Sequence, residues 1–363
     1  MKRPSRRTLI RRAAGLFTIP ALWNSARSER VTARARPPRI KIGQIGVGHA
    51  HATKLSVYRR SEDYEVVGLV EPDDRLREEA RSKEVYRGLP WMTREQLLDV
   101  PGLQAVLVET RVRDLLETAG ACVDAGMHVH LDKPAGESLS RYRRILEAAS
   151  KKNLWVQMGY MYRYNPAVVL LREVLGRGWL GEVFEVHTAM SKVVAPAERT
   201  ALAAYRGGIM FELGCHVIDL VVGVLGAPTR VTAYPRHSSG RDDGLLDNML
   251  AVFEYPGATA TVRSSALEVD GFERRHLVVC GTGGTFHIQP LDSPSARVAF
   301  STAHGAYRQG YQDVSFPKFT RYVADAADMA RVIRGEKAAD FTPRHDLAVQ
   351  AAVLRACGRP TDA

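Results

Sequence analysis

The segment 128–134 (His-Val-His-Leu-Asp-Lys-Pro) places a lysine directly after a short apolar strand. Pro134 disfavours a helical conformation at Lys133, so the lysine side chain leaves an extended backbone. An ammonium fixed in this way can hydrogen-bond a substrate hydroxyl and stabilise its oxygen as the proton leaves, which eases the loss of a hydride. We therefore predict that Lys133 is catalytic; the alternative is an exposed loop lysine.

Two histidines precede this lysine. His128 and His130 share one face of the strand, and their ring nitrogens are of the kind that metals bind. The sequence offers no third ligand with suitable spacing. We predict that both histidines are structural and that the protein holds no metal.

The segment 207–219 begins with a glycine pair and carries three ionisable residues in an otherwise apolar run. Spacings of four and three residues place Glu212, His216 and Asp219 on one face of a helix. A histidine has a pKa suited to removing a hydroxyl proton near neutral pH, so we predict that His216 is the catalytic base. Glu212 would orient the imidazole or bind substrate hydroxyls, and Asp219 would position the ring or contact substrate. A histidine satisfied within the core is the alternative.

Gly46 and Gly48 follow the first apolar strand and open a helix. Glycines at such positions let the backbone turn tightly and approach a pyrophosphate at the helix N-terminus. Glu71 ends the next strand, 25 residues after Gly46, where an acid can hold the ribose 2′-hydroxyl of NAD. Arg75 lies nearby, where it could bind a 2′-phosphate, so NADP remains the alternative cofactor. We predict an NAD or NADP site with NAD slightly favoured; a plain strand–helix turn with a solvated glutamate is the alternative.

The elements that position these residues alternate between apolar strands and helical stretches. This pattern predicts βαβ units and a parallel sheet covered on both faces. The expected strands are 40–47, 65–70, 105–108, 128–131 and 154–158, and the expected helices are 50–58, 73–81, a helix ending at 125, and 140–150. We predict the α/β class, with a doubly wound (Rossmann) domain over residues 39–158. Lys133 then lies beyond the carboxyl end of a strand, where such sheets bind ligands.

After residue 159 the strands alternate polar and apolar residues and are linked by hairpin turns such as Pro256-Gly257. The expected strands are 183–190, 230–234, 247–255, 258–266, 276–280 and 285–289, and the expected helices are 166–177, 209–225, 319–334 and 346–356. We predict a C-terminal α+β domain over residues 159–363, with an open, mainly antiparallel sheet, for substrate binding and oligomerisation.

Residues 1–38 have the pattern of a leader and linker. The stretch 5–11 contains a twin arginine and precedes a mildly apolar run over 13–22, which is the order of a Tat export signal. A disordered basic tail is the alternative. Most of the net charge of +11 lies in residues 1–39, which hold 11 Lys and Arg against one Glu. The rest of the chain is nearly neutral, so we expect no nucleic-acid partner.

The chain of 363 residues has room for about two domains. It has no run of 18 or more apolar residues, so we expect no transmembrane helix. The four cysteines are far apart and form no C-x-x-C pair. We predict buried thiols, although an oxidising destination leaves a disulfide open. The leader predicts an exported, periplasmic protein that uses the Tat machinery, and its cofactor would be loaded before export and tightly bound.

Four motifs resemble those of the Gfo/Idh/MocA oxidoreductase family. They are Gly46-x-Gly48, Asp132-Lys133-Pro134, the segment 161–166 (Met-Tyr-Arg-Tyr-Asn-Pro) and the segment 207–219. The resemblance covers about residues 39–350. It implies that Lys133, His216 and Glu212 act on a small-molecule sugar, inositol or related polyol with NAD or NADP.

Together with the residues described above, the resemblance also implies which residues contact the cofactor and the substrate, and how the protein forms oligomers. The implied cofactor contacts are Gly46, Gly48, His49, His51, Glu71, Arg75, Thr110, Asp132 and Lys133. The implied substrate contacts are Arg163, Glu212 and Asp219. A dimer or tetramer would form through the open sheet.

The sequence departs from the family pattern in four places. Asp132 replaces the usual Glu beside the lysine, and Glu212 replaces the usual Asp. Ala50 or His51 stands where the fingerprint has a third glycine. The segment 110–115 (Thr-Arg-Val-Arg-Asp-Leu) replaces a T-P-N-x-x-H pattern on the nicotinamide side. Its two arginines either recognise an acidic sugar or are solvated, and we favour solvated.

Three functions agree with these features. The leading one is an exported oxidoreductase that moves a hydride between a polyol and NAD(P). The second is redox-neutral: the sugar is oxidised, a glycosidic bond is cleaved by elimination, and the cofactor is restored within the cycle. The third is a dinucleotide-binding sensor without catalysis, which the presence of both Lys133 and His216 argues against.

Overall fold

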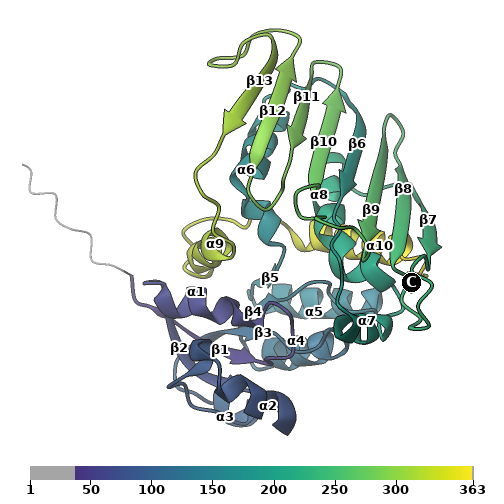
Figure 1. Ribbon diagram of the computed structural model, residues 1–363. Helices are drawn as coiled ribbons and strands as arrows, with labels where there is room; N and C mark the ends of the chain where they lie inside the picture. Colours follow the sequence, from purple (N-terminus) through teal and green to yellow (C-terminus); the bar gives the residue numbers. More distant parts are fainter. Residues whose placement is uncertain (1–36, 362–363) are drawn as a thin grey trace, which may run out of the picture. The chain divides into compact units, whose positions relative to one another are not determined.

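The computed structural model describes residues 37–361. The N-terminal domain is built on a five-stranded parallel sheet with the strand order β2-β1-β3-β4-β5 (Figure 1). Its strands are β1 (Ile40–Ile45), β2 (Tyr64–Val70), β3 (Leu103–Val108), β4 (His128–Leu131) and β5 (Val156–Met158). The strands are largely apolar because both faces of a parallel sheet are covered. The doubly wound domain predicted from the sequence is confirmed.

Three of the helices between these strands, α2, α3 and α5, begin at residues whose side chains cap the helix N-terminus. Asp73 accepts a hydrogen bond from the Leu76 amide at the start of α2, and Thr93 begins α3 with a capping box. The helical elements are η1 (Ala52–Lys54), α1 (Leu55–Arg60), α2 (Asp74–Arg81), η2 (Glu84–Tyr86), α3 (Arg94–Leu98), η3 (Val112–Asp114), α4 (Leu115–Asp124) and α5 (Leu139–Lys151). Short loops therefore lie at the carboxyl ends of the strands, where ligands bind in this fold.

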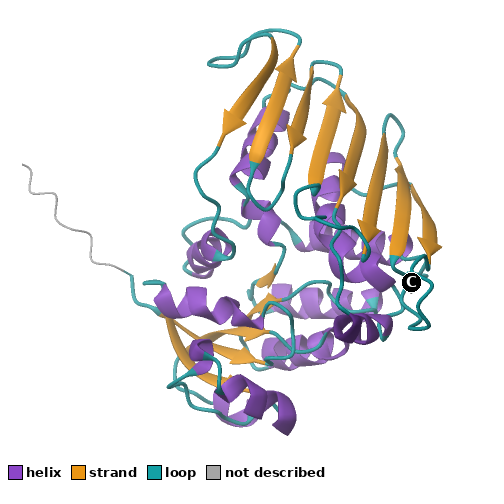
Figure 2. Cartoon of the chain, in the orientation of Figure 1, coloured by secondary structure: helices purple, strands orange, loops and turns teal. Residues whose placement is uncertain are grey.

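The C-terminal domain contains an eight-stranded sheet, whose strands are orange in Figure 2. The strand order is β13-β12-β11-β10-β6-β9-β8-β7 (Figure 1). Its strands are β6 (Val183–Ala189), β7 (Arg230–Arg236), β8 (Asn248–Glu254), β9 (Thr259–Ser265), β10 (His276–Gly281), β11 (Gly284–Ile288), β12 (Ser295–Phe300) and β13 (Gly310–Ser315). All neighbours are antiparallel except β6 and β9, which are parallel. The open, mainly antiparallel sheet is confirmed; β12 and β13 were not expected from the sequence.

Helices cover one face of this second sheet. Val262 and Val279 of the sheet are buried in the same hydrophobic core as Val217 and Val221 of α8. The helical elements here are η4 (Met161–Tyr164), α6 (Pro166–Gly176), α7 (Pro196–Ala203), the π-helical segment η5 (Met210–Gly214), α8 (Cys215–Leu225), α9 (Val323–Ile333) and α10 (Pro343–Ala356). On β8, buried residues alternate with partly exposed ones, as in a sheet covered on one face.

Helix α9 returns from the C-terminal domain to the first sheet. Its Met329 and Ala330 are buried in one cluster with Ile40 and Tyr58. The Tyr64 hydroxyl donates a 2.7 Å hydrogen bond to a backbone carbonyl of this helix. The chain segment after residue 322 therefore completes the core of the N-terminal domain, which the order of elements in the sequence does not reveal.

No helix in residues 37–361 is long and apolar enough to cross a membrane. The predicted export signal lies outside the described residues. All four cysteines are free; Cys122, Cys215 and Cys357 are buried, and Cys280 is partly buried.

Candidate active site

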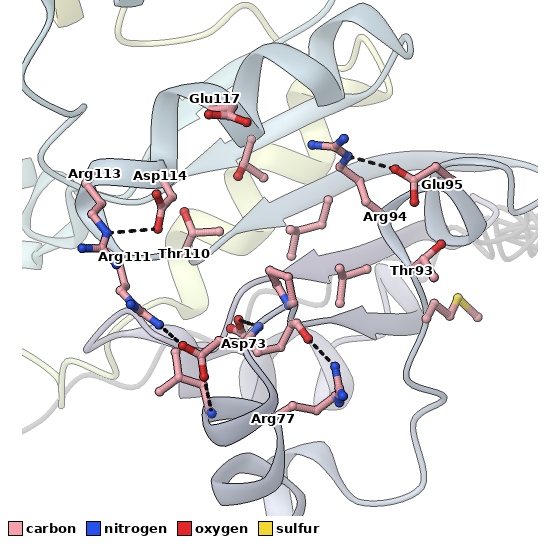
Figure 3. Close-up of a pocket in the computed structure, with 17 residues that line it drawn as sticks. Asp73, Arg77, Thr93, Arg94, Glu95, Thr110, Arg111, Arg113, Asp114 and Glu117 are labelled. Atoms are coloured by element: carbon pink, nitrogen blue, oxygen red, sulfur yellow. Dashed lines mark hydrogen bonds and ion pairs between the residues drawn. The ribbon is translucent and has the colours of Figure 1, made fainter.

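A cavity of about 750 Å³ opens beside the carboxyl ends of β1, β2 and β3 (Figure 3). Ile45, Val70 and Thr110, at or just beyond these ends, line it. The charged residues of its lining are Glu71, Asp73, Arg77, Arg94, Glu95, Arg111, Arg113, Asp114 and Glu117. This is the place where a doubly wound sheet binds a nucleotide.

The glycine pair is required by close packing in the loop after β1. Gly46 has a φ of +95°, and a Cβ atom there would lie 2.4 Å from the Thr110 amide nitrogen. A Cβ at Gly48 would lie 3.1 Å from the Leu76 side chain and 3.2 Å from that of Arg111. Only glycine therefore fits at position 46, whereas a side chain at position 48 would require small shifts of Leu76 and Arg111.

Glu71 lies at the cavity, but its carboxylate already binds backbone amides. Its Oε2 accepts a 2.8 Å hydrogen bond from Val47, and its Oε1 accepts one of 3.0 Å from Asp73. The acid thus holds the glycine loop next to the cavity. The Thr110 hydroxyl, which belongs to a lining residue, is buried and has no protein partner. The cavity, the glycine loop, Glu71 and this unpaired hydroxyl fit a dinucleotide.

The arginines around the cavity differ in their partners. Arg111 forms an ion pair with Asp73, and both side chains are one-third exposed. The pKa of Asp73 is lowered, first by the Leu76 amide and then by Arg111. Arg113 is largely exposed and pairs with its neighbour Asp114. Arg75 pairs with Glu79 and is absent from the lining, so the structure does not place it at the nucleotide cavity as the sequence analysis expected.

Lys133 meets Glu212 across the two domains. The lysine Nζ donates hydrogen bonds of 2.9 Å to both the carboxylate and the backbone carbonyl of Glu212. Burial opposes both charges, yet the carboxylate raises the pKa of Lys133 and the ammonium lowers the pKa of Glu212. The site therefore contains a fixed ammonium paired with a carboxylate at neutral pH.

His216 lies beside this pair. Its ring centroid is 6.1 Å from that of Tyr160 and 5.5 Å from that of Tyr162. Burial, followed by the charge of Lys133, lowers its pKa well below the usual value. The imidazole is therefore neutral near pH 7 and has a lone pair that can accept a proton. Its Nδ1 is buried without a partner, which leaves Nε2 as the nitrogen that a substrate can reach.

Asp132 is a buried acceptor shared by several groups. Its carboxylate oxygens lie 3.0 Å from His49 Nδ1, 3.3 Å from His51 Nδ1 and 2.8 Å from Lys54 Nζ. His49 Nε2 also lies 3.1 Å from the Lys133 carbonyl. Asp132, His49 and His51, which the resemblance assigned to the cofactor, thus form one network that fixes the backbone under Lys133.

The sequence analysis missed Lys54 and Glu109. Lys54 Nζ lies 3.0 Å from Glu109, and both side chains are fully buried. Against the effect of burial, Asp132 and then Glu109 raise the pKa of Lys54. The sequence around Lys54 (Ala-Thr-Lys-Leu-Ser-Val-Tyr) mixes polar and apolar residues and gives no clear signal of a buried lysine. This lysine neutralises Asp132.

Ligand-type atoms of His49, His51 and Asp132 lie within 4.8 Å of one another. However, the Lys54 ammonium already occupies the cationic position next to Asp132. We therefore assign no metal to this cluster. His128 accepts a 2.9 Å hydrogen bond from the Trp155 amide, and His130 is buried; a structural role for both histidines stays a prediction.

Arg163 and Asp219 were predicted from the sequence to contact substrate, and the structure corrects this prediction. Arg163 Nε donates 3.0 Å hydrogen bonds to both carboxylate oxygens of Asp219, and its guanidinium also binds Asp346 at 2.6 Å. Both side chains are at least 97% buried. Both side chains are therefore held by buried protein partners, and we interpret the pair as structural.

The predicted polar stripe divides because its members have different partners. Residues 210–214 form a π-helical turn before α8 begins at Cys215, and a π turn has more residues per turn than an α-helix. Glu212 then contacts Lys133, whereas Asp219 contacts Arg163. Of the predicted trio, only Glu212 and His216 lie beside Lys133.

Comparison with known protein families identifies the class. Residues 40–160 match the oxidoreductase family model with an NAD-binding Rossmann fold, and residues 168–287 match the GFO/IDH/MocA C-terminal domain. Together these matches cover more than half of the chain. The chain belongs to the GFO/IDH/MocA oxidoreductase family.

Two of the curated proteins with similar sequences are dehydrogenases. The chain is 27% identical over 208 residues to trans-1,2-dihydrobenzene-1,2-diol dehydrogenase of Sus scrofa, covering 56% of this chain and 60% of the relative. It is 29% identical over 220 residues to inositol 2-dehydrogenase of Streptomyces avermitilis, covering 60% and 61%. The chain thus spans about three fifths of the length of these relatives.

A solved structure shares the fold over nearly its whole length. An oxidoreductase from Agrobacterium radiobacter, solved with NAD⁺, L-tartaric acid and magnesium, matches with a TM-score of 0.75. The two are 15% identical, and the match covers 88% of this chain and 97% of that one. At this identity the likeness concerns the fold alone.

Proposed function

We propose that this protein oxidises a CH–OH group of a sugar, inositol or related polyol with NAD or NADP as hydride acceptor. The observation that carries the proposal is the 2.9 Å contact between Lys133 Nζ and Glu212 Oε1, beside the neutral His216. Two domains supply these groups, and the nucleotide cavity lies in the same domain as the lysine. The named activities of the diol and inositol dehydrogenases support this substrate class.

Each residue has a defined task in this reaction. Bound NAD or NADP would supply the hydride-accepting ring. The Lys133 ammonium would donate a hydrogen bond to the substrate oxygen and stabilise its developing negative charge. His216 Nε2 would take the hydroxyl proton. Glu212 would hold the lysine in place and accept hydrogen bonds from a neighbouring substrate hydroxyl.

The charge at Glu71 favours NAD over NADP. Its carboxylate lines the cavity and is fixed by two backbone amides. A fixed negative charge repels a 2′-phosphate, whereas it can accept a hydrogen bond from a 2′-hydroxyl. We therefore expect tighter binding of NAD.

Replacing Glu71 with Gln is expected to shift the ratio of the NAD and NADP dissociation constants toward NADP by about tenfold, or ~1.4 kcal/mol. The amide keeps the shape of the side chain and removes its charge, but its NH2 group can no longer accept one of the two backbone hydrogen bonds. Both nucleotides share that loss, so their ratio reports the effect of the charge. Isothermal titration of both nucleotides measures the ratio. Glu79→Gln, on the exposed side of α2, is the matched control and should leave the ratio unchanged. An unchanged ratio in the Glu71 variant would assign nucleotide choice to other residues.

The proposal includes export with a bound cofactor. The twin arginine at Arg6 and Arg7, followed by an apolar run, supports transport of the folded protein. Fractionation of cells that express the wild type should place it in the periplasm, and Lys at both positions should retain it in the cytoplasm. A cytoplasmic wild type would contradict this part of the proposal.

Self-association is also proposed. The second sheet carries exposed aromatic side chains at Phe184, Tyr234 and Tyr311, which are 46–63% exposed. Large exposed apolar groups on an open sheet are typical of protein interfaces. Light scattering after gel filtration should give the mass of a dimer or tetramer, and the mass of one chain would contradict it.

The decisive experiment combines cofactor identification with turnover. The purified chain is denatured, and mass spectrometry identifies the released small molecule, which we expect to be NAD. A panel of sugars, inositols and glycosides is then added to protein loaded with NAD or NADP. Reduction of the nucleotide by a polyol supports the proposed reaction. Release of free sugar without net reduction would instead indicate the redox-neutral route. If neither nucleotide reduction nor sugar release is observed, catalysis of this class is rejected.

A further inference from the structure

His51 lies between the buried carboxylate of Asp132 and the imidazole of His216. Its Nδ1 is 3.3 Å from Asp132 Oδ1, and its ring centroid is 5.8 Å from that of His216. The titratable or charged groups around it are Asp132, His49, Lys133, Glu212, His216 and Tyr322. The proposed reaction uses His216 but gives His51 no task.

The surroundings of His51 fix which ring nitrogen carries its proton. Asp132 is ionised, because His49 and Lys54 lower its pKa well below the usual value against the effect of burial. An ionised carboxylate only accepts hydrogen bonds, so His51 donates from Nδ1. Burial lowers the pKa of His51 to about 4 despite the opposing charge of Asp132. The ring is therefore neutral at pH 7, with its lone pair on Nε2.

His216 is poorly suited to retain a proton. It is 2% exposed, and it lies close enough to the Lys133 ammonium for that charge to disfavour an imidazolium. Its buried Nδ1 has no partner to stabilise the charge. The His51 side chain, in contrast, is 18% exposed and is backed by a carboxylate. A proton on His51 therefore has both a counter-charge and a route to water.

We propose that His51 is the second imidazole of a proton relay that carries the substrate's hydroxyl proton from His216 to solvent. This rests on the proposed function. As the hydride leaves the carbinol carbon for NAD(P)⁺, the O–H bond breaks and its proton binds His216 Nε2. That proton then passes to His51 Nε2, directly or through one water, and leaves to bulk solvent. His216 regains its lone pair, and the carbonyl product, NAD(P)H and one proton balance the reaction.

The position of His51 in the sequence supports a specific role. It stands where the dinucleotide fingerprint has its third glycine, at the third position after Gly48. A small residue there would allow close helix packing, so an imidazole is unexpected on structural grounds alone. Its contacts instead go to Asp132 on one side and to the rings of His216 and Tyr322 on the other.

The test compares His51→Ala with His287→Ala, a histidine on β11 of the second sheet. We expect His51→Ala to lower kcat about 100-fold, in the range for loss of a proton-transfer group. KM and the NAD dissociation constant should change less than threefold. Added imidazole should restore part of the rate to His51→Ala, and the solvent isotope effect on kcat should increase in this variant. His287→Ala should match the wild type in all five readouts.

Distinct results separate the relay from the proposed function. A wild type that oxidises no polyol overturns both. An active wild type with an equally active His51→Ala overturns the relay alone. A His51→Ala variant that loses NAD affinity more than tenfold, while kcat is kept, assigns the residue to cofactor binding and also overturns the relay.

A second measurement does not depend on turnover. Nuclear magnetic resonance of ¹⁵N-histidine-labelled protein identifies the His51 signal by its loss in His51→Ala. The relay requires the Nδ1–H form at pH 7 in the wild type. Observation of the Nε2–H form would remove the lone pair that the relay requires on Nε2 and would overturn the proposal.

Discussion

Lys133→Met is expected to lower kcat by about 10³-fold or more while leaving NAD binding within about threefold of the wild type. The methionine has nearly the same length but offers no donor to the substrate oxygen. It also leaves the Glu212 carboxylate without the ammonium that now lies 2.9 Å away, which adds to the loss. The nucleotide cavity contains no atom of the Lys133 side chain, so cofactor binding should persist. Stopped-flow measurement of nucleotide reduction and titration of NAD give the two quantities.

Lys152→Met provides the matched control for this experiment. Lys152 is largely exposed at the end of α5, where it hydrogen-bonds the carbonyls of Val123 and Asp124. The same substitution there should leave kcat unchanged. Full activity of Lys133→Met would show that the ammonium plays no part in the reaction, and the proposed role of the lysine would be wrong.

The first sheet and the position of its ligand loops follow from the sequence because the interactions are local. Largely apolar strands, helix caps such as Thr93 and the glycines after β1 each specify a conformation within a few residues. Lys133 at the carboxyl end of β4 follows from the same rule. The second sheet was predicted in type, but its strands 295–300 and 310–315 lack a turn signal as plain as Pro256-Gly257.

What the sequence does not show depends on contacts between distant segments. Asp132 and Lys54 are 78 residues apart, and no periodicity links them. Helix α9 covers the first sheet although it follows all of the second. Helical spacing placed Asp219 with His216, but Arg163, which also binds Asp346, holds the Asp219 carboxylate in a separate buried ion network. The partners of a buried ionisable group determine its role. These partners come from distant parts of the chain and cannot be read from a local sequence pattern.

The Arg163 cluster is the clearest case, because the sequence suggested substrate binding and the structure shows a buried ion network. Its guanidinium binds Asp219 and Asp346 and lies 4.2 Å from the Phe341 ring centroid. Burial opposes its charge, but Asp219 and then Asp346 raise the pKa of Arg163. Removal of the cation would leave two buried carboxyl groups without their partner. That loss is far more costly than the net contribution of an intact pair.

Arg163→Met is accordingly expected to lower the free energy of unfolding by about 3–5 kcal/mol. Urea denaturation followed by circular dichroism measures this change as a lower midpoint at constant slope. Arg172→Met is the matched control: Arg172 lies on α6, is one-third exposed and pairs with Asp340 at 3.8 Å, so its loss should cost less than about 1 kcal/mol. The double change Arg163→Met with Asp219→Asn should recover part of the stability, because it removes one of the unpaired charges. If Arg163→Met were instead as stable as the wild type and raised KM for a polyol, the guanidinium would contact substrate, as the motif alone had suggested.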